Sequence, residues 1–208
     1  MAVSAFVQVR VVAQETSQAP QVGAGKVTGS TYFSQYFQFS LTIPTAWSVY
    51  DSEGRQLILE KGHKELTAKM PDKKTQEALD AGIANTTVLL TVSKLPRTQT
   101  GPDNASFSCG AERLPPGSFT GRDYLISMKT IMLRLKDPPA FEGEIGSELI
   151  GGAEFAVLTL SRSDFGAPIG QRYWSIVKKG HAIFCISTYA NEDDKRLLNQ
   201  TMNSLKFQ

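Results

Sequence analysis

The chain contains two histidines, His63 and His181, which are the residues best suited to proton transfer or metal binding. His63 begins a His-Lys-Glu triplet that matches the start of a zinc deaminase motif, but the Pro-Cys-x-x-Cys that completes the motif is absent. A zinc site would need both histidines and further ligands from distant segments. A Ser-His-Asp triad could combine His181 with Asp164, although no spacing favours it. We therefore predict no catalytic residue and no metal site, and we interpret both histidines as exposed turn residues.

Two glycine-containing stretches match phosphate-binding or hydrolase motifs only in part. In Gly23-Ala24-Gly25-Lys26, Pro20 stands where a phosphate loop begins with glycine, and Val27 replaces the serine or threonine. The stretch 117–121 (GSFTG) is not G-x-S-x-G, and its serine does not follow a buried strand. We interpret the first stretch as a flexible tail and the second as a loop that leads into a helix. No cofactor is expected.

Four residues in the last third of the chain form the most promising binding cluster: Arg162, Asp164, Arg172 and Trp174. An arginine beside an aromatic ring is common at protein-binding surfaces, and in a strand Arg172 and Trp174 share one face. The alternative is that Trp174 belongs to the core and that Arg172 extends along its rim. We predict a partner-binding surface at these four residues, with the core position of Trp174 as the alternative.

The balance of charge and apolar residues excludes several classes of partner. The chain has 22 basic and 20 acidic residues, so no strong field would gather nucleic acid or anionic lipid. No apolar run approaches the ~20 residues of a membrane-spanning helix. An apolar share of 41% in 208 residues is enough for one domain with a substantial core. We expect a protein partner, no nucleic acid and no integral membrane segment.

Two features bear on the compartment. Residues 1–13 are apolar except for Ser4, Gln8 and Arg10, which is compatible with the end of a secretion signal; the alternative is a short strand that docks on the sheet. Cys109 and Cys185 are either two buried thiols or one long-range disulfide, which would require an oxidising compartment. We predict export to the periplasm or the cell exterior, with the cytoplasm as the alternative.

Strict alternation of apolar residues predicts an opening strand over 32–43. Phe37, Phe39, Leu41 and Ile43 lie two apart, which places them on one face of a sheet. We predict further strands from Trp47 and over 56–60, 86–95, 144–150, 153–162, 171–178 and 181–189, helices over 72–85 and 121–136, a last helix capped by Asn191, and a long loop over 96–120. Adjacent strands with helices packed on the sheet indicate an α+β fold, an antiparallel sheet sandwiched by helices.

The opening strand and the last third of the chain resemble the PsbP/DcrB-like superfamily of α/β/α sandwiches. Residues 36–47 (YFQFSLTIPTAW) resemble the F-x-F-x-x-P-x-x-W strand with which that group opens, and the similar closing segments are 152–155 (GAEF), 171–174 (QRYW), 182–187 (AIFCIS) and 204–207 (SLKF). The resemblance implies one PsbP-like domain over 31–208, preceded by a flexible tail or signal remnant over 1–30. The group includes extrinsic photosystem proteins and bacterial envelope lipoproteins, which implies binding or assembly rather than catalysis.

From the residues and the resemblance together, we predict a non-catalytic, exported bacterial protein that binds a partner or assembles in the envelope. The alternative is a small-molecule-binding or hydrolytic enzyme with its site under the 96–120 loop. A deep pocket that holds His63 or His181 with carboxylates would favour the alternative. A flat face with exposed aromatic side chains would favour partner binding.

Overall fold

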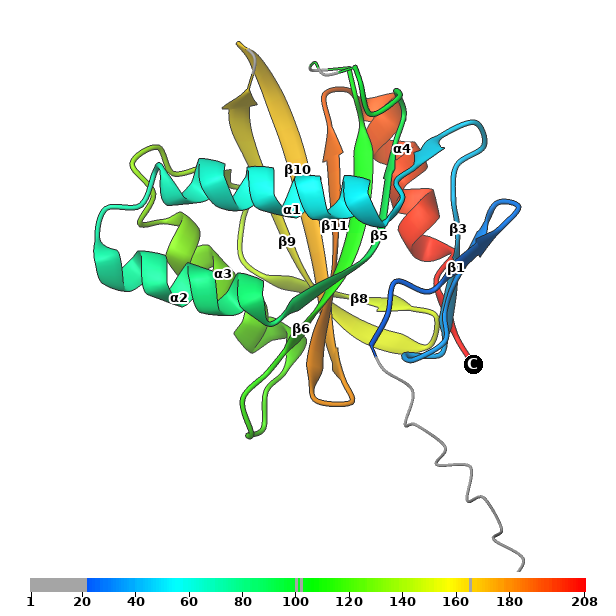
Figure 1. Ribbon diagram of the computed structural model, residues 1–208, viewed down its shortest axis with the longest axis horizontal. Coiled ribbons are helices and arrows are strands. Elements are labelled where there is room, and N and C mark those ends of the chain that lie inside the picture. The colour runs from blue at the N-terminus through cyan, green and yellow to red at the C-terminus, as the bar shows by residue number, and fades with distance from the viewer. Residues whose placement is uncertain (1–21, 100, 102, 165) are drawn as a thin grey trace, which may run out of the picture.

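The computed structural model describes residues 22–99, 101, 103–164 and 166–208 as four helices and two antiparallel sheets (Figure 1). The helices are α1 (Ser52–Thr67), α2 (Lys73–Ala84), α3 (Gly121–Met132) and α4 (Glu192–Asn203). The small sheet has the order β1-β2-β3-β12, and its strands are β1 (Lys26–Thr28), β2 (Thr31–Ser34), β3 (Phe39–Thr42) and β12 (Lys206–Phe207). The secretion signal predicted within residues 1–13 lies outside the described residues.

The large sheet has eight strands in the order β4-β5-β6-β11-β10-β9-β7, and β8 also pairs with β9. These strands are β4 (Ser48–Val49), β5 (Thr86–Ser93), β6 (Ser106–Arg113), β7 (Ala140–Phe141), β8 (Gly146–Ile150), β9 (Ala153–Asp164), β10 (Ala167–Lys178) and β11 (His181–Tyr189).

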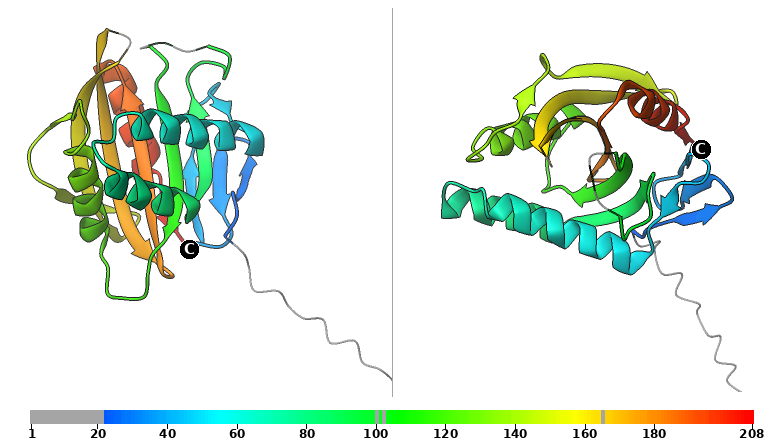
Figure 2. Two further views of the ribbon diagram at one scale, coloured as in Figure 1. Left: turned by 60° about the vertical axis from the view of Figure 1, so that its left-hand side comes forward. Right: turned by 90° about the horizontal axis from the view of Figure 1, so that it is seen from above.

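The large sheet is strongly curled, and helices cover both of its faces (Figure 2). Helices α1, α2 and α3 lie over one face, whereas α4 and the small sheet lie over the other. This arrangement confirms the predicted α+β class, with an antiparallel sheet between helices. Within the described ranges, no helix is both long enough and apolar enough to cross a membrane.

The main core lies between the large sheet, α4 and the small sheet. The four alternating side chains of the opening segment, Phe37, Phe39, Leu41 and Ile43, are each no more than 3% exposed, as predicted. Leu198 of α4 packs in the same core and is fully buried. Each apolar side chain removed from water here stabilises the fold at about 25 cal/mol per Å².

Residues 32–43 form a hairpin, not the single strand that we predicted. Tyr32 of β2 lies opposite Leu41 of β3, and Gln38 takes a positive φ of 55° in the turn between them. Because a glutamine rarely adopts this conformation, the turn carries no residue type that would mark it in the sequence. β1 pairs with β2 in the same sheet, so the folded domain begins before the predicted boundary at residue 31.

Two further element predictions are wrong. Residues 56–60, predicted as a strand, belong to α1, which Asp51 caps by accepting a hydrogen bond from the Gly54 amide at 2.7 Å. The predicted loop over 96–120 contains β6, which lies in the middle of the large sheet between β5 and β11. Both segments border the same cavity, α1 as part of its roof and β6 as part of its floor.

The predicted N-terminal ends of α2, α3 and α4 are confirmed, whereas α3 ends at Met132 and not at the predicted residue 136. Asp72, Thr120 and Asn191 each accept a backbone hydrogen bond as the N-caps of α2, α3 and α4. Lys179 and Gly180 have positive φ values of 50° and 72° and form the tight turn between β10 and β11. The ends of these elements can be predicted because the cap and turn residues have characteristic types.

Candidate functional site

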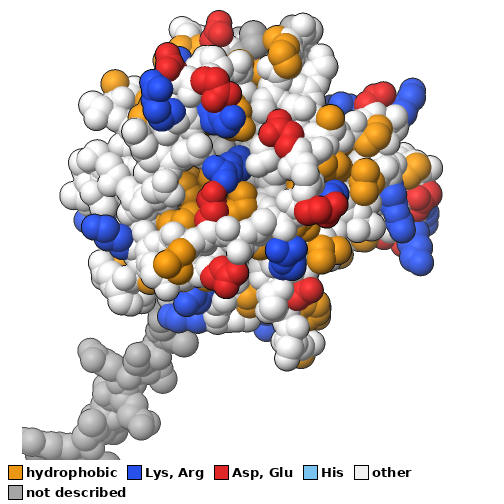
Figure 3. Space-filling view, turned by 180° about the vertical axis from the view of Figure 1, so that it is seen from behind, with side chains coloured by type: hydrophobic (Ala, Val, Ile, Leu, Met, Phe, Trp, Pro, Cys, Tyr) orange, Lys and Arg blue, Asp and Glu red, His pale blue; other side chains and the backbone are white. Residues whose placement is uncertain are grey.

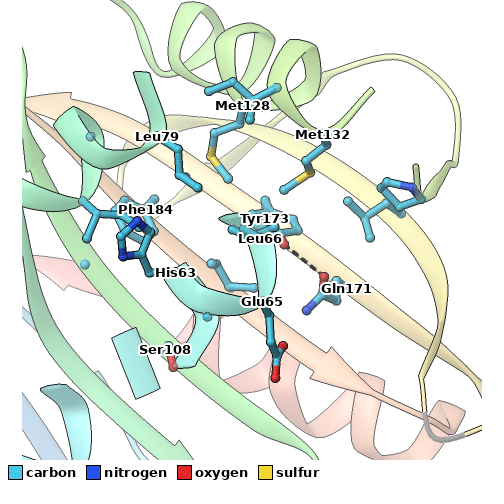
Figure 4. A pocket seen from close by; sticks show the side chains of 18 of the residues that line it. His63, Glu65, Leu66, Leu79, Ser108, Met128, Met132, Gln171, Tyr173 and Phe184 are labelled. Atoms are coloured by element: carbon cyan, nitrogen blue, oxygen red, sulfur yellow. Dashed lines mark hydrogen bonds between the residues drawn. The ribbon is translucent and has the colours of Figure 1, made fainter. Parts of the chain in front are cut away.

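A cavity of about 1800 Å³ lies between the large sheet and the three helices α1, α2 and α3 (Figure 4). Its floor is the face of β5, β6, β11 and β10 opposite to the main core, and its roof is the helical hairpin formed by α1 and α2. Ligand pockets typically measure about 300–1,000 Å³. This cavity is therefore large enough for a sizeable small molecule.

The helical hairpin covers the sheet without packing into a core of its own. Gly54 is the one buried residue of α1, and Thr75 is the one buried residue of α2. Leu66 of α1 and Leu79 of α2 line the cavity and are only half-buried. The apolar side chains that would normally join such helices to a sheet face the cavity instead.

The hairpin is held at its margins. His63 Nε2 and Asp80 Oδ1 are 2.6 Å apart and join α1 to α2. At the tip, the Lys136 amide donates to the Lys69 carbonyl at 3.0 Å, which ties the α1–α2 turn to the segment that follows α3. This arrangement keeps the roof in place while the space beneath its middle remains open to a ligand.

One part of the cavity has apolar and aromatic walls. Met128 and Met132 project from α3 toward Tyr173 of β10, and Leu79 approaches from α2 (Figure 4). Phe184 of β11 lies flat against the backbone at Gly110, where a Cβ atom would come within 2.5 Å of the ring. Methionine side chains are flexible and polarisable, so this wall can adapt to apolar ligands of varied shape.

Another part of the same sheet face is polar and uncharged. The Ser108 hydroxyl donates to Thr91 Oγ1 at 3.2 Å. Gln171 Nε2 donates to Thr188 Oγ1 at 3.1 Å, and the Tyr173 hydroxyl donates to Gln171 Oε1 at 3.0 Å. These side chains lie side by side across four strands, so the floor of the cavity passes from apolar to polar along the strands.

A carboxylate borders the apolar part. Glu112 of β6 accepts a hydrogen bond from the Tyr124 hydroxyl of α3 at 2.9 Å, and the Tyr124 ring stacks on Phe184. Burial raises the pKa of Glu112 above its ordinary value, an effect that the Tyr124 hydrogen bond opposes. Burial also raises the pKa of Tyr124 well above its ordinary value, and the neighbouring Glu112 raises it further.

This burial predicts a pH dependence of stability. Because the folded-state pKa of Glu112 is raised above the ordinary 4.5, the folded state holds more protons than the unfolded state in the pH range immediately above 4.5. Glu112 therefore favours folding less as pH rises through that range. We expect Glu112→Gln, which keeps an acceptor for Tyr124, to gain stability relative to the wild type between pH 4 and pH 7. Urea denaturation at a series of pH values measures this difference, and a constant difference across the series would contradict it.

Neither histidine lies where it could form the zinc site or the Ser-His-Asp triad that was considered from the sequence. Asp80 pairs with His63, and the His181 ring nitrogen Nδ1 lies 2.8 Å from the Lys179 carbonyl. His181 and Asp164 lie at opposite ends of the β10 ladder, which excludes a triad between them. In the described part of the chain, no three His, Cys, Asp or Glu side chains gather as metal ligands would.

The four predicted site residues do not form one surface. Arg162 of β9 is exposed on the face that carries the cavity, and the side chain of Asp164 lies outside the described residues. Arg172 and Trp174 lie on the opposite face, where Trp174 is 1% exposed. Because Trp174 is buried, its ring cannot contribute to an exposed patch. The alternative, a core tryptophan with Arg172 at its rim, describes the structure.

A small polar network holds Arg172 and Trp174 in place. The Trp174 indole donates to Glu148 Oε2 at 2.9 Å, and the Arg172 guanidinium pairs with the other oxygen of the same carboxylate. Arg172 also donates to Asn199 Oδ1 of α4 at 3.1 Å and lies 5.2 Å from the centre of the Trp174 ring. These contacts are those of a structural junction between β8, β10 and α4.

The outer surface on this side does not indicate a charged partner. Figure 3 shows acidic and basic side chains interspersed over the face behind the large sheet, with small apolar areas between them. This mixture matches the balanced composition and is typical of a solvated face.

The two cysteines form a disulfide. Cys109 of β6 and Cys185 of β11 are directly opposite in neighbouring strands, with Cα atoms 4.1 Å apart, and both are buried in the main core. Of the two alternatives left open by the sequence, the structure shows the disulfide, although Cys109 lies in a strand and not in a loop. Disulfides of this kind form and persist in oxidising compartments.

Comparison with solved structures agrees with the fold. No family model and no curated protein sequence matches the chain. The solution structure of CyanoP, the cyanobacterial PsbP of Synechocystis sp. PCC 6803, matches with a TM-score of 0.50 and 13% identity over 92% of this chain and 99% of that one. The chain therefore has the PsbP-like α+β fold, as the resemblance implied.

Two other structures match at lower TM-scores. A protein from Bacteroides thetaiotaomicron matches with a TM-score of 0.44 and 12% identity over 88% of this chain, which spans 49% of that longer protein. LpqN, described as involved in cell envelope biogenesis of Mycobacterium tuberculosis, matches with a TM-score of 0.40 and 14% identity over 86% of this chain and 84% of that one.

Proposed function

We propose that the protein is an exported bacterial binding protein, without a catalytic step of its own, that acts in the cell envelope. Its ligand is an apolar or amphipathic small molecule held beneath the helical hairpin of α1 and α2. The observation that carries this proposal is the cavity of about 1800 Å³ with apolar side chains from all three overlying helices directed into it.

The walls of the cavity supply the energy for binding an apolar ligand. Leu79, Met128 and Phe184 line it from α2, α3 and β11. Covering such side chains with an apolar ligand removes surface from water at about 25 cal/mol per Å². Because these side chains are contributed by separate elements, one ligand would contact the roof, the side wall and the floor together.

Export is supported by the disulfide between Cys109 and Cys185. In reducing compartments thiols are kept free, so a buried disulfide in the middle of a sheet fits the periplasm or the cell exterior. An envelope location also suits a binding protein for apolar molecules, which need a carrier in water.

The geometry favours binding over hydrolysis, even though the cavity contains a histidine. His63 lines the cavity, which is the feature that would favour an enzyme, but its ring is paired with Asp80 across the two roof helices. A general base must lie within reach of the proton it removes, and a nucleophile must be hydrogen-bonded to its base. Among the described residues, no hydroxyl or thiol side chain is hydrogen-bonded to His63.

Contacts with a protein partner remain a second part of the proposal. Arg162 and Arg172 are the predicted surface residues that retain some exposure, on opposite faces of the sheet. A partner would therefore engage one of these faces and not a single four-residue patch.

The binding proposal can be tested with an uncharged fluorescent probe and two variants of one helix. N-phenyl-1-naphthylamine, which brightens in apolar surroundings, is expected to bind the wild type. Met128→Glu places a carboxylate among apolar walls and is expected to weaken binding at least about tenfold, because an unpaired charge loses its hydration there. Ile126→Glu makes the same change on the outer side of α3, where Ile126 is 48% exposed, and should bind as the wild type does.

The comparison of the two variants decides the outcome. Thermal denaturation followed by circular dichroism checks that both variants are folded. Equal affinity of both folded variants for the probe, or no binding to the wild type, would overturn the proposed function.

A further inference from the structure

We propose that the ligand is an amphiphile whose head group is uncharged and rich in hydroxyl groups, such as a sugar or another polyol. This inference rests on the proposed function and specifies the class of ligand. The head group would lie on the polar part of the sheet face, and the apolar chain would extend toward α2 and α3. We call the residues of the polar part the polar row: Thr91, Ser106, Ser108, Gln171 and Thr188.

The polar row crosses four adjacent strands of the large sheet. Thr91 of β5 lies opposite Ser108 of β6, and Thr188 of β11 lies opposite both Ser106 of β6 and Gln171 of β10. Side chains that are directly opposite in paired strands point to the same face. All five residues line the cavity, so the row is a continuous polar strip on its floor.

A sheet face covered by helices usually carries apolar residues, and the rest of this floor does. Val88, Tyr173, Phe184 and Ile186 line the cavity along the same strands. The change from apolar to polar residues therefore occurs within single strands, between Phe184 and Thr188 on β11. A ligand that lies along these strands would meet an apolar environment at one end and hydrogen-bonding groups at the other.

The polar row offers donors and acceptors without formal charge. Each hydroxyl provides one donor and two acceptor positions, and each amide provides two donors and one acceptor oxygen. The bonds from Ser108 to Thr91 and from Gln171 to Thr188 use only part of that capacity. Sugar hydroxyls are also donors and acceptors at once, so the two sets of groups are complementary.

An ionic head group fits this site less well. A phosphate, sulfate or ammonium group that leaves water without a counter-charge pays a large desolvation cost. The charged residues that line the cavity are Lys61, Glu65, Lys69, Asp123, Asp137 and Arg162, all of them exposed, and Glu112, which is half-buried. They include both signs, so they do not select one net charge for the ligand.

Three amphiphiles with the same dodecyl chain test the inference: dodecyl maltoside, dodecyl sulfate and dodecyltrimethylammonium. Each is titrated below its critical micelle concentration against wild-type protein loaded with N-phenyl-1-naphthylamine. We expect the maltoside to displace the probe at a concentration about tenfold lower than either ionic compound requires, the equivalent of one or two hydrogen bonds. Equal potency of the three would overturn the head-group inference while leaving the proposed function intact. Failure of the probe itself to bind would overturn the proposed function.

Variants of the polar row locate the head group. Gln171→Leu combined with Thr188→Val is expected to weaken binding of the maltoside about tenfold, because its head group loses hydrogen-bonding partners. Thr159→Val, a similar change on β9, whose Leu160 and not Thr159 faces the cavity, serves as the control and should bind the maltoside as the wild type does. Wild-type affinity of the double variant for the maltoside would contradict the assignment.

A charge-introducing variant covers the case in which the double variant does not fold. Gln171→Glu keeps the shape of the side chain and adds a negative charge to the row. We expect its preference to move from the maltoside toward dodecyltrimethylammonium. An unchanged order of the three amphiphiles would show that the head group does not contact this row.

Discussion

Replacing Cys109 and Cys185 together by alanine is expected to lower the free energy of unfolding by about 2–5 kcal/mol. The disulfide joins residues that are 76 positions apart, so its loss frees a long loop in the unfolded chain. It also leaves unfilled space in the main core, because both residues are at most 1% exposed. Alanine is the suitable replacement because serine would bury a hydroxyl. Urea denaturation of the variant and the wild type measures the difference.

Reductant provides the matched control for this result. The stability of the wild type should fall to near that of the double variant when a thiol reductant is present, whereas the double variant should not respond. Alkylation of the unfolded wild type should modify neither cysteine without reductant and both cysteines with it. A wild type that is alkylated at both positions without reductant would show that the disulfide does not form, and would remove the support for export.

Trp174→Ala is expected to lower the free energy of unfolding by about 3–5 kcal/mol. The ring is 1% exposed in the main core, so the variant loses a large apolar side chain and leaves a cavity. It also leaves the Glu148 carboxylate without the indole donor that now lies 2.9 Å away. Trp174→Phe retains most of the ring but not the donor, and should cost less, about 1–2 kcal/mol.

The second tryptophan gives the control for this prediction. Trp47 packs against the same core but is only partly buried, so Trp47→Ala should cost less than Trp174→Ala. Denaturant unfolding followed by circular dichroism compares the variants without relying on tryptophan fluorescence. A larger loss at Trp47 than at Trp174 would mean that Trp174 is not the core tryptophan.

The hairpin at 32–43 shows what the alternation of apolar residues can predict and what it cannot. Period two correctly identified Phe37, Phe39, Leu41 and Ile43 as core residues. It did not reveal the turn, because the apolar pattern continues through Gln38, whose positive φ the residue type does not suggest. The alternation therefore predicts which side chains of this segment face the core, but it does not predict that the segment forms two strands.

The error at α1 has a cause that is related to the cavity. Gly54 resembles a turn residue, yet it lies in the first turn of a helix, where a Cβ atom would come within 3.0 Å of Tyr50 and Asp51. In addition, α1 has no strong apolar stripe, because its inner residues border a cavity rather than a core. The pattern by which a helix is usually recognised is therefore weak in the helix that roofs the site.

No sequence motif predicts the candidate site. Leu79, Met128 and Phe184 lie far apart in the chain and have the residue types of ordinary helices and strands. One pattern was present within the predicted loop: Phe107, Cys109 and Ala111 alternate with more polar residues and are all buried in β6. Recognition of that strand would have predicted a polar face, but only the fold shows that the face borders a cavity.

The most direct test of ligand binding in the cavity uses the methionine methyl groups as reporters. Met128 and Met132 line the cavity, whereas Met202 is fully buried on the other side of the large sheet. In protein labelled with carbon-13 at the methionine methyls, titration with dodecyl maltoside below its critical micelle concentration should shift the signals of Met128 and Met132 in a saturable way and leave that of Met202 in place. Unchanged signals from both Met128 and Met132 at saturating amphiphile would contradict the proposed binding site.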